Sequence, residues 1–190
     1  MRKLLFAWMM TFALGAAAAE VAGVKMPDTM KLGNADLMFN GGGLRIKVFF
    51  KVYVAGLYLT EKKGTAADVL GLKGPKRMHI VTRRDLGAED FANALVEGIH
   101  NNLPESEAAA MKPRIEQFRK AILDIKETKE GTVVELDYLP ETGTRFSLNG
   151  QQRGADIPGE DFYRALLRIW LGDKPAQEDL KNALLGKSAS

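Results

Sequence analysis

The clearest pattern in the chain is an alternation of apolar and polar positions from Leu44 to Thr60. Its even positions are almost wholly apolar, whereas its odd positions include Arg45, Lys47, Lys51 and Tyr53. A period of two residues predicts a half-buried β-strand. Because this segment is long for a single strand, we expect a bend or a hairpin inside it.

Shorter patterns of both kinds surround this segment. We expect strands at residues 37–39, 76–82, 132–139 and 144–148. Apolar residues recur at helical spacing in residues 66–70, 88–101, 108–125, 161–171 and 176–185. The run Asn40–Gly43 predicts a tight turn. Strands, helices, strands and helices in that order predict an α+β fold, with a mainly antiparallel sheet and helices on one face.

The N-terminus has the layout of a secretory signal peptide. Arg2 and Lys3 precede an apolar run over residues 4–14, and small residues follow up to Ala19. The alternative is an uncleaved membrane anchor, but the apolar run is short for a span of about 20 residues. We therefore expect cleavage after residues 1–19 and a periplasmic protein, with a lead-in at 20–36, one domain at 37–186 and a tail at 187–190. No later segment is apolar and long enough to cross a bilayer.

Composition excludes several functions. The chain has 27 Lys and Arg against 24 Asp and Glu, and loss of the leader leaves the mature protein close to neutral. That balance does not predict the clustered positive surface that binds nucleic acid. The chain has no cysteine, which excludes disulfides, thiol catalysis and thiolate metal sites. His79 and His100 fall in a predicted strand and at a predicted helix end, so we expect no metal and no cofactor.

Four stretches, in order, resemble the chalcone isomerase-like family. They are Asn40–Arg45 with Lys51–Leu59, Gly87–Glu89, Glu107–Met111 with Phe118, and Ala165–Gly172 with Asp179–Leu185. The ending Ile169–Gly172 is typical of the exported bacterial branch of that family. The resemblance implies a large antiparallel sheet with a helical layer on one side, and a ligand cleft between parts of the sheet and the helices.

The resemblance does not extend to the catalytic residues of plant chalcone isomerases. Those enzymes stabilise developing negative charge with an arginine, two threonines, a tyrosine, a lysine and an asparagine. Only the arginine is kept, as Arg45. The other positions fall on Tyr53, Asp90, Asn93, Glu97 and Ile169. Because acids oppose the formation of an anion beside them, we expect no isomerase activity.

Non-catalytic relatives of this fold hold fatty acids through the arginine and a tyrosine. The resemblance therefore implies Arg45 as a bidentate partner for a carboxylate and Tyr53 as an O–H donor. An unbroken strand would separate these two residues by about 26 Å. A shared site therefore requires the strand to fold back or bulge near Lys47. Candidate apolar walls of the pocket are Phe49, Phe50, Phe91, Leu95, Phe118 and Trp170.

Three functions stay open on these residues. The first is a non-catalytic periplasmic protein that binds a small amphipathic or carboxylated ligand such as a fatty acid, which predicts an apolar-lined cavity beside Arg45. The second is a structural or interaction protein with a closed cleft, which predicts an exposed apolar patch instead. The third is an isomerase or lyase that uses Arg45 with Asp90 or Glu97, which predicts a carboxylate of raised pKa in the pocket. The sequence indicates no particular protein partner. Arg45 as a solvated strand residue, Tyr53 as an ordinary sheet aromatic and the Phe118 stripe as part of the core remain alternatives to a binding role.

Overall fold

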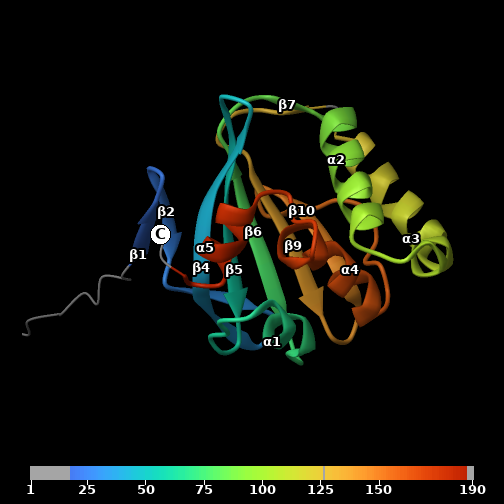
Figure 1. The fold of residues 1–190 in the computed structure, drawn as a ribbon, viewed down its shortest axis with the longest axis horizontal. Coiled ribbons are helices and arrows are strands. Elements are labelled where there is room, and N and C mark those ends of the chain that lie inside the picture. Colours follow the sequence, from blue (N-terminus) through green and yellow to red (C-terminus); the bar gives the residue numbers. More distant parts are fainter. Residues whose placement is uncertain (1–17, 126, 188–190) are drawn as a thin grey trace, which may run out of the picture.

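A curled antiparallel sheet organises the computed structural model, which describes residues 18–125 and 127–187 (Figure 1). Within those residues the sheet has seven strands in the order β11-β10-β9-β6-β5-β4-β3, and all neighbours are antiparallel. The strands are β3 (Thr29–Leu32), β4 (Ala35–Lys47), β5 (Phe50–Leu59), β6 (Lys76–Thr82), β9 (Val133–Leu139), β10 (Gly143–Leu148) and β11 (Gln151–Gln152). The expected sheet is confirmed.

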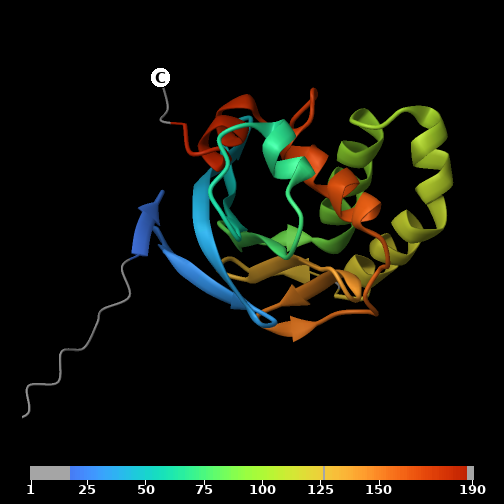
Figure 2. The same ribbon diagram turned by 90° about the horizontal axis from the view of Figure 1, so that it is seen from below.

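The helices gather on the inner side of this curl, as Figure 2 shows. In the described ranges they are α1 (Ala66–Gly71), α2 (Ala88–Asn101), α3 (Glu105–Leu123), α4 (Glu160–Leu171) and α5 (Glu178–Leu184). The most deeply buried helix is α4, and its Tyr163 hydroxyl donates a hydrogen bond to the carbonyl of Leu136 on β9 at 2.9 Å. The α+β class with helices on one face is therefore confirmed. In the described part of the chain, no helix is both long and apolar enough to span a bilayer.

Two small two-stranded sheets complete the fold. One joins β1 (Ala18–Val21) to β2 (Val24–Pro27), and the other joins β7 (Leu86–Gly87) to β8 (Glu127–Thr128). The expected lead-in, residues 20–36, thus supplies strands, and β3 pairs with β4 in the main sheet. Most of the expected signal peptide (residues 1–17) and most of the expected tail (188–190) lie outside the described residues. The expected cleavage after Ala19 would fall within β1.

The long alternating segment folds back on itself as predicted. β4 and β5 form a hairpin in which Lys47 pairs with Phe50, so Val48 and Phe49 form the turn. The pairing also shifts register between Arg45 and Ile46, where the ladder is irregular. The chain therefore folds back near Lys47 and is also irregular there, and either feature would meet the requirement for a shared site.

The predicted turn at Asn40–Gly43 is wrong, because these residues lie inside β4. Gly42 pairs with Gly56 on β5, and α5 packs against the same stretch of β4. A Cβ atom at Gly41 would collide with the carbonyl oxygen of Ala183. The glycines permit close approach of a helix to the strand, which is a different use of glycine from a turn.

Candidate functional site

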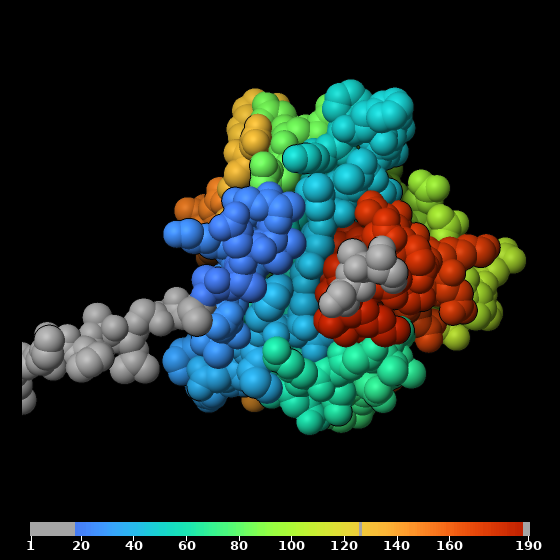
Figure 3. Space-filling model, turned by 60° about the vertical axis from the view of Figure 1, so that its left-hand side comes forward, coloured from blue at the N-terminus to red at the C-terminus, as the bar shows by residue number. Residues whose placement is uncertain are grey.

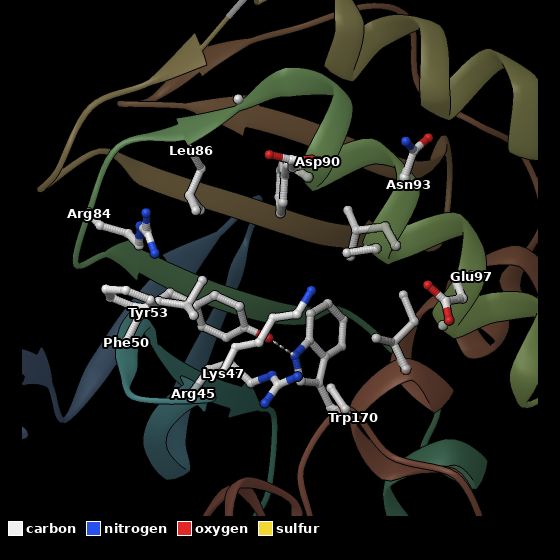
Figure 4. A pocket seen from close by; sticks show the side chains of 18 of the residues that line it. Arg45, Lys47, Phe50, Tyr53, Arg84, Leu86, Asp90, Asn93, Glu97 and Trp170 are labelled. Carbon is white, nitrogen blue, oxygen red and sulfur yellow. Dashed lines mark hydrogen bonds between the residues drawn. The ribbon is translucent and has the colours of Figure 1, made fainter.

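A cavity of about 770 Å³ lies where the hairpin end of the sheet meets α2 and the end of α4 (Figure 4). Its walls come from the β4–β5 hairpin, the connection from β6 to β7, α2, and the segment from α4 to α5. This volume falls within the range of about 300–1,000 Å³ that is usual for small-molecule sites. The cavity occupies the position expected for the ligand cleft, between sheet and helices.

The hairpin brings Arg45 and Tyr53 to the same wall of the cavity. The two residues are direct partners across β4 and β5. Cα atoms of such partners lie about 4.5–5.5 Å apart. The separation that an unbroken strand would impose is therefore absent, and the two side chains lie at one site.

The hydroxyl group of Tyr53 has a hydrogen that it can donate to a ligand. Its hydroxyl oxygen accepts from the indole N–H of Trp170 at 2.9 Å, as the dashed line in Figure 4 shows. Burial raises the pKa of Tyr53, and the bond from Trp170 and the charge of Arg45 oppose that rise only in part. The hydroxyl therefore stays protonated at neutral pH. Within the described residues its hydrogen has no acceptor, so a ligand oxygen can take it.

Gln177 positions Arg45 at the edge of the cavity. Nη1 of Arg45 donates to Oε1 of Gln177 at 3.3 Å and to the carbonyl of Ile46 at 2.5 Å. The same Gln177 oxygen accepts from the backbone N–H of Ile46 at 2.9 Å. Between residues 18–125 and 127–187, no ion pair joins Arg45 to an acid, so its charge is available to an anion.

The structure places four of the six predicted wall residues on the cavity. These are Phe50, Phe91, Leu95 and Trp170. Phe49 does not join them, because it lies in the hairpin turn with 90% of its surface exposed. Phe118 does not join them either, because the apolar stripe of α3 faces the core. There it packs edge-on against Phe146 and Phe162.

Opposite charges face each other across the cavity. Arg45, Lys47 and Arg84 lie on the sheet side, and α2 presents Asp90 and Glu97 from the other side (Figure 4). An anionic group is therefore favoured near the hairpin and disfavoured near α2.

Local contacts fix the charged side chains on the sheet side of the cavity. The guanidinium carbon of Arg84 lies 4.7 Å from the ring centroid of Phe50, a cation–π arrangement that fixes both side chains. Asp85 also lines the cavity, but its carboxylate accepts from the backbone N–H of Glu130 and pairs with Lys129 at 3.1 Å. The bond from Glu130, followed by that from Lys129, lowers the pKa of Asp85. Asp85 therefore stays ionised and is held by groups outside the cavity.

All six positions that the family resemblance assigned to catalytic residues of plant chalcone isomerases line this one cavity. They are Arg45, Tyr53, Asp90, Asn93, Glu97 and Ile169. Asp90, Asn93 and Glu97 are spaced by three and four residues, which places them on one face of α2. The residues that the family resemblance singled out therefore belong to one site.

The described residues offer no group of three or more acids, histidines or cysteines that could hold a metal ion. His79 lies on β6, with Nδ1 3.4 Å from a carboxylate oxygen of Glu135 on β9. Neither His79 nor Glu135 lines the cavity.

A half-barrel sheet that encloses a small-molecule cavity beneath a helical layer defines the class of this protein. A family model described as chalcone isomerase-like matches residues 18–186, and the chain belongs to that family. Among solved structures, the chain is similar to the crystal structure of a fatty-acid binding protein of Arabidopsis thaliana, AtFAP1, with a TM-score of 0.66 and 16% sequence identity. That similarity covers 86% of this chain and 92% of the plant protein. No curated protein sequence matches the chain.

Proposed function

We propose that this protein binds a carboxylated amphipathic molecule of the fatty-acid class in the cavity and does not convert it. The observation that carries the proposal is the pairing of Arg45 with Tyr53 at the cavity wall. One side chain has a charge without an acidic partner among the described residues, and the other has an O–H without an acceptor there. A carboxylate satisfies both. The structural likeness to a plant fatty-acid binding protein supports the same class of ligand.

The charge asymmetry gives the ligand an orientation. Its carboxylate lies toward Arg45 and Tyr53, while its apolar part runs over Phe91, Leu95 and Ile169. The acids of α2 stand where chalcone isomerases stabilise an anion, so the site supports binding of a carboxylate at the sheet side and opposes ring closure.

We place this function in the periplasm, because residues 1–19 have the layout of a signal peptide. Export predicts a mature chain that begins at Glu20. The intact mass of protein released by osmotic shock of expressing cells measures that directly. A full-length mass, or retention of the protein in the cytoplasmic fraction, would contradict it.

The binding proposal is tested by native mass spectrometry of the mature protein, with lipid extraction of what co-purifies. We expect a stoichiometric carboxylic acid on the wild type and its loss from Arg45→Ala. Arg153→Ala is the matched control, since Arg153 is an exposed arginine that does not line the cavity. An apo mass for the wild type, with no uptake of added dodecanoate, would refute the proposal.

An interaction protein with a closed cleft is not supported, because the cleft holds a cavity of about 770 Å³. The exposed apolar surface that this alternative predicted is nevertheless present, at the tip of the β4–β5 hairpin.

A further inference from the structure

The hairpin tip, residues Ile46–Lys51, concentrates exposed apolar side chains. Of the five exposed large hydrophobic residues in the described part of the chain, four are in it: Ile46 at 42%, Val48 at 75%, Phe49 at 90% and Phe50 at 59%. The fifth, Met38, lies at the opposite end of β4. In Figure 3 this end of the hairpin, in cyan, projects from the body of the molecule. Single exposed apolar residues are ordinary, but four together at a projecting tip indicate a partner.

The backbone conformation of the turn is unfavourable for the residue that occupies it. Val48 has a φ of 59°, a left-handed conformation that glycine or asparagine adopts readily and a β-branched residue rarely does. The chain thus places an apolar, mostly exposed residue where a polar turn residue would strain the backbone less. Burial in the core does not explain that choice, since 75% of the surface of Val48 is exposed.

The tip is also basic. Arg45, Lys47 and Lys51 flank the apolar residues, and the sequence has no Asp or Glu between Asp36 and Glu61. Arg84 adds a fourth positive charge through its contact with Phe50.

Acidic residues also lie at this end of the molecule, on the β7–β8 side. Asp85 and Glu127 there both pair with Lys129, at 3.1 Å and 2.8 Å. Within the described residues no ion pair joins Arg45, Lys47, Lys51 or Arg84 to an acid, so the positive charges around the apolar tip are unpaired.

An anionic lipid surface fits this chemistry. Aromatic and aliphatic side chains at a narrow tip enter the boundary between headgroups and acyl chains, while lysines contact the headgroups. A stable protein–protein contact buries about 800 Å² on each partner and is usually broad. The end of a two-stranded hairpin is convex and narrow, which suits insertion between headgroups better than a broad interface.

The tip also borders the cavity. Lys47, Val48 and Phe50 belong to both, so the cavity opens beside the apolar tip. We infer that the hairpin tip docks on anionic membranes and turns the mouth of the cavity toward the lipid. Docking depends on the tip alone, so it does not require that the proposed ligand be correct.

Co-sedimentation with vesicles tests this inference. We expect the mature protein to bind vesicles that contain phosphatidylglycerol and to bind pure phosphatidylcholine vesicles weakly. Phe49→Ser lowers vesicle binding about tenfold or more, because a phenyl group no longer leaves water. Lys51→Glu removes one positive charge and adds one negative charge, and each of these changes lowers vesicle binding about fivefold. Added salt weakens vesicle binding of the wild type, because it screens the same attraction. Met38→Ser is the matched control, since it removes an exposed apolar side chain away from the tip, and it leaves vesicle binding unchanged.

Three results would overturn the inference. They are failure of the wild type to bind anionic vesicles, equal binding by Phe49→Ser, and a concentration-dependent dimer that Phe49→Ser abolishes, which would assign the tip to a second copy of the chain. Because Phe49 is exposed and outside the cavity, its substitution preserves thermal unfolding and the response of Trp170 fluorescence to dodecanoate. Those two controls separate a failed docking surface from a misfolded protein or a failed ligand site.

Discussion

At the scale of single residues, the hydroxyl of Tyr53 is the most informative group in the cavity. It accepts from Trp170 and offers its own hydrogen to the cavity. Tyr53→Phe therefore removes one charge-assisted hydrogen bond from a bound carboxylate, and we expect the affinity for dodecanoate to fall about tenfold. Isothermal titration calorimetry measures this without using the fluorescence of Trp170, which the substitution itself disturbs.

Tyr58 supplies the control for that experiment. It lies on the same strand, but its buried hydroxyl has no hydrogen-bond partner among the described residues and does not line the cavity. Tyr58→Phe is expected to leave dodecanoate affinity unchanged and stability equal or slightly higher. Equal affinity losses in Tyr53→Phe and Tyr58→Phe would mean that the effect comes from the sheet and that Tyr53 does not contact the ligand.

Lys76 is a second residue whose chemistry is set by burial. Its side chain is 1% exposed, and Nζ lies 3.2 Å from the carbonyl of Gly74 and 3.9 Å from a carboxylate oxygen of Glu160. Burial lowers the pKa of Lys76 to about 8, and the charge of Glu160 opposes that fall only partly. The folded protein therefore releases this proton at a lower pH than the unfolded chain does.

This difference predicts a stability that rises with pH. Between about pH 8 and the ordinary lysine pKa, the unfolded state binds more protons than the folded state, so the free energy of unfolding increases. From pH 7 to pH 9.5 we expect Lys76 to contribute a rise of about 2 kcal/mol. Urea denaturation at several pH values measures it. Lys76→Met should remove the rise, and an unchanged slope in that variant would show that other groups cause it.

At the scale of elements, the β4–β5 hairpin shows what the sequence could predict and what it could not. Alternation over Leu44–Thr60 predicted the strands and the fold-back. It could not locate the turn, because Val48 and Phe49 are not turn-forming residues. The turn was instead predicted at the glycines before Leu44, because glycine is common in turns. Their use depends on α5, which packs there from more than a hundred residues further along the chain, and a local pattern does not contain that information.

The contact between β4 and α5 gives a test at the same scale. A Cβ atom at Gly43 would lie 2.8 Å from the Cβ of Ala183. We expect Gly43→Ala to lower the free energy of unfolding by about 1–3 kcal/mol through overpacking. Gly64→Ala, where an added Cβ meets nothing within 4 Å, should change it by less than about 0.5 kcal/mol.

A double variant identifies the clashing atom. Ala183→Gly removes the methyl group that Gly43→Ala would meet, so the pair should show a favourable coupling free energy of about 1 kcal/mol or more. Gly41→Ala collides with the backbone oxygen of Ala183, and Ala183→Gly should not rescue it. Similar rescue of both would argue that α5 shifts as a body and that no single methyl contact is responsible.

At the scale of the whole molecule, some residues of the cavity could be predicted from the sequence and others could not. Residues on one regular element, such as Asp90 and Glu97 on α2, could be placed from their spacing and the family resemblance. Gln177, Arg84 and Lys174 could not, because they come from connections that meet only when the chain is folded. Phe118 had two interpretations, a core residue on the apolar stripe of α3 and a candidate wall of the pocket, and the structure places it in the core.

The position of the cavity beside the hairpin tip leads to a last prediction that joins both proposals. On these two proposals, a fatty acid that leaves a membrane at the tip would enter the cavity without crossing bulk water, whose cohesion disfavours an exposed acyl chain. We expect the mature protein to speed the transfer of a fluorescent fatty acid from anionic donor vesicles to neutral acceptor vesicles.

Phe49→Ser should slow that transfer about tenfold, in proportion to its loss of vesicle binding, while its affinity for dodecanoate in solution stays unchanged. Tyr53→Phe should show the opposite pattern of binding: its affinity for dodecanoate falls, while its binding to vesicles stays normal. Transfer by Phe49→Ser at the rate of the wild type would show that the ligand passes through water, and the tip would then have no part in loading the cavity.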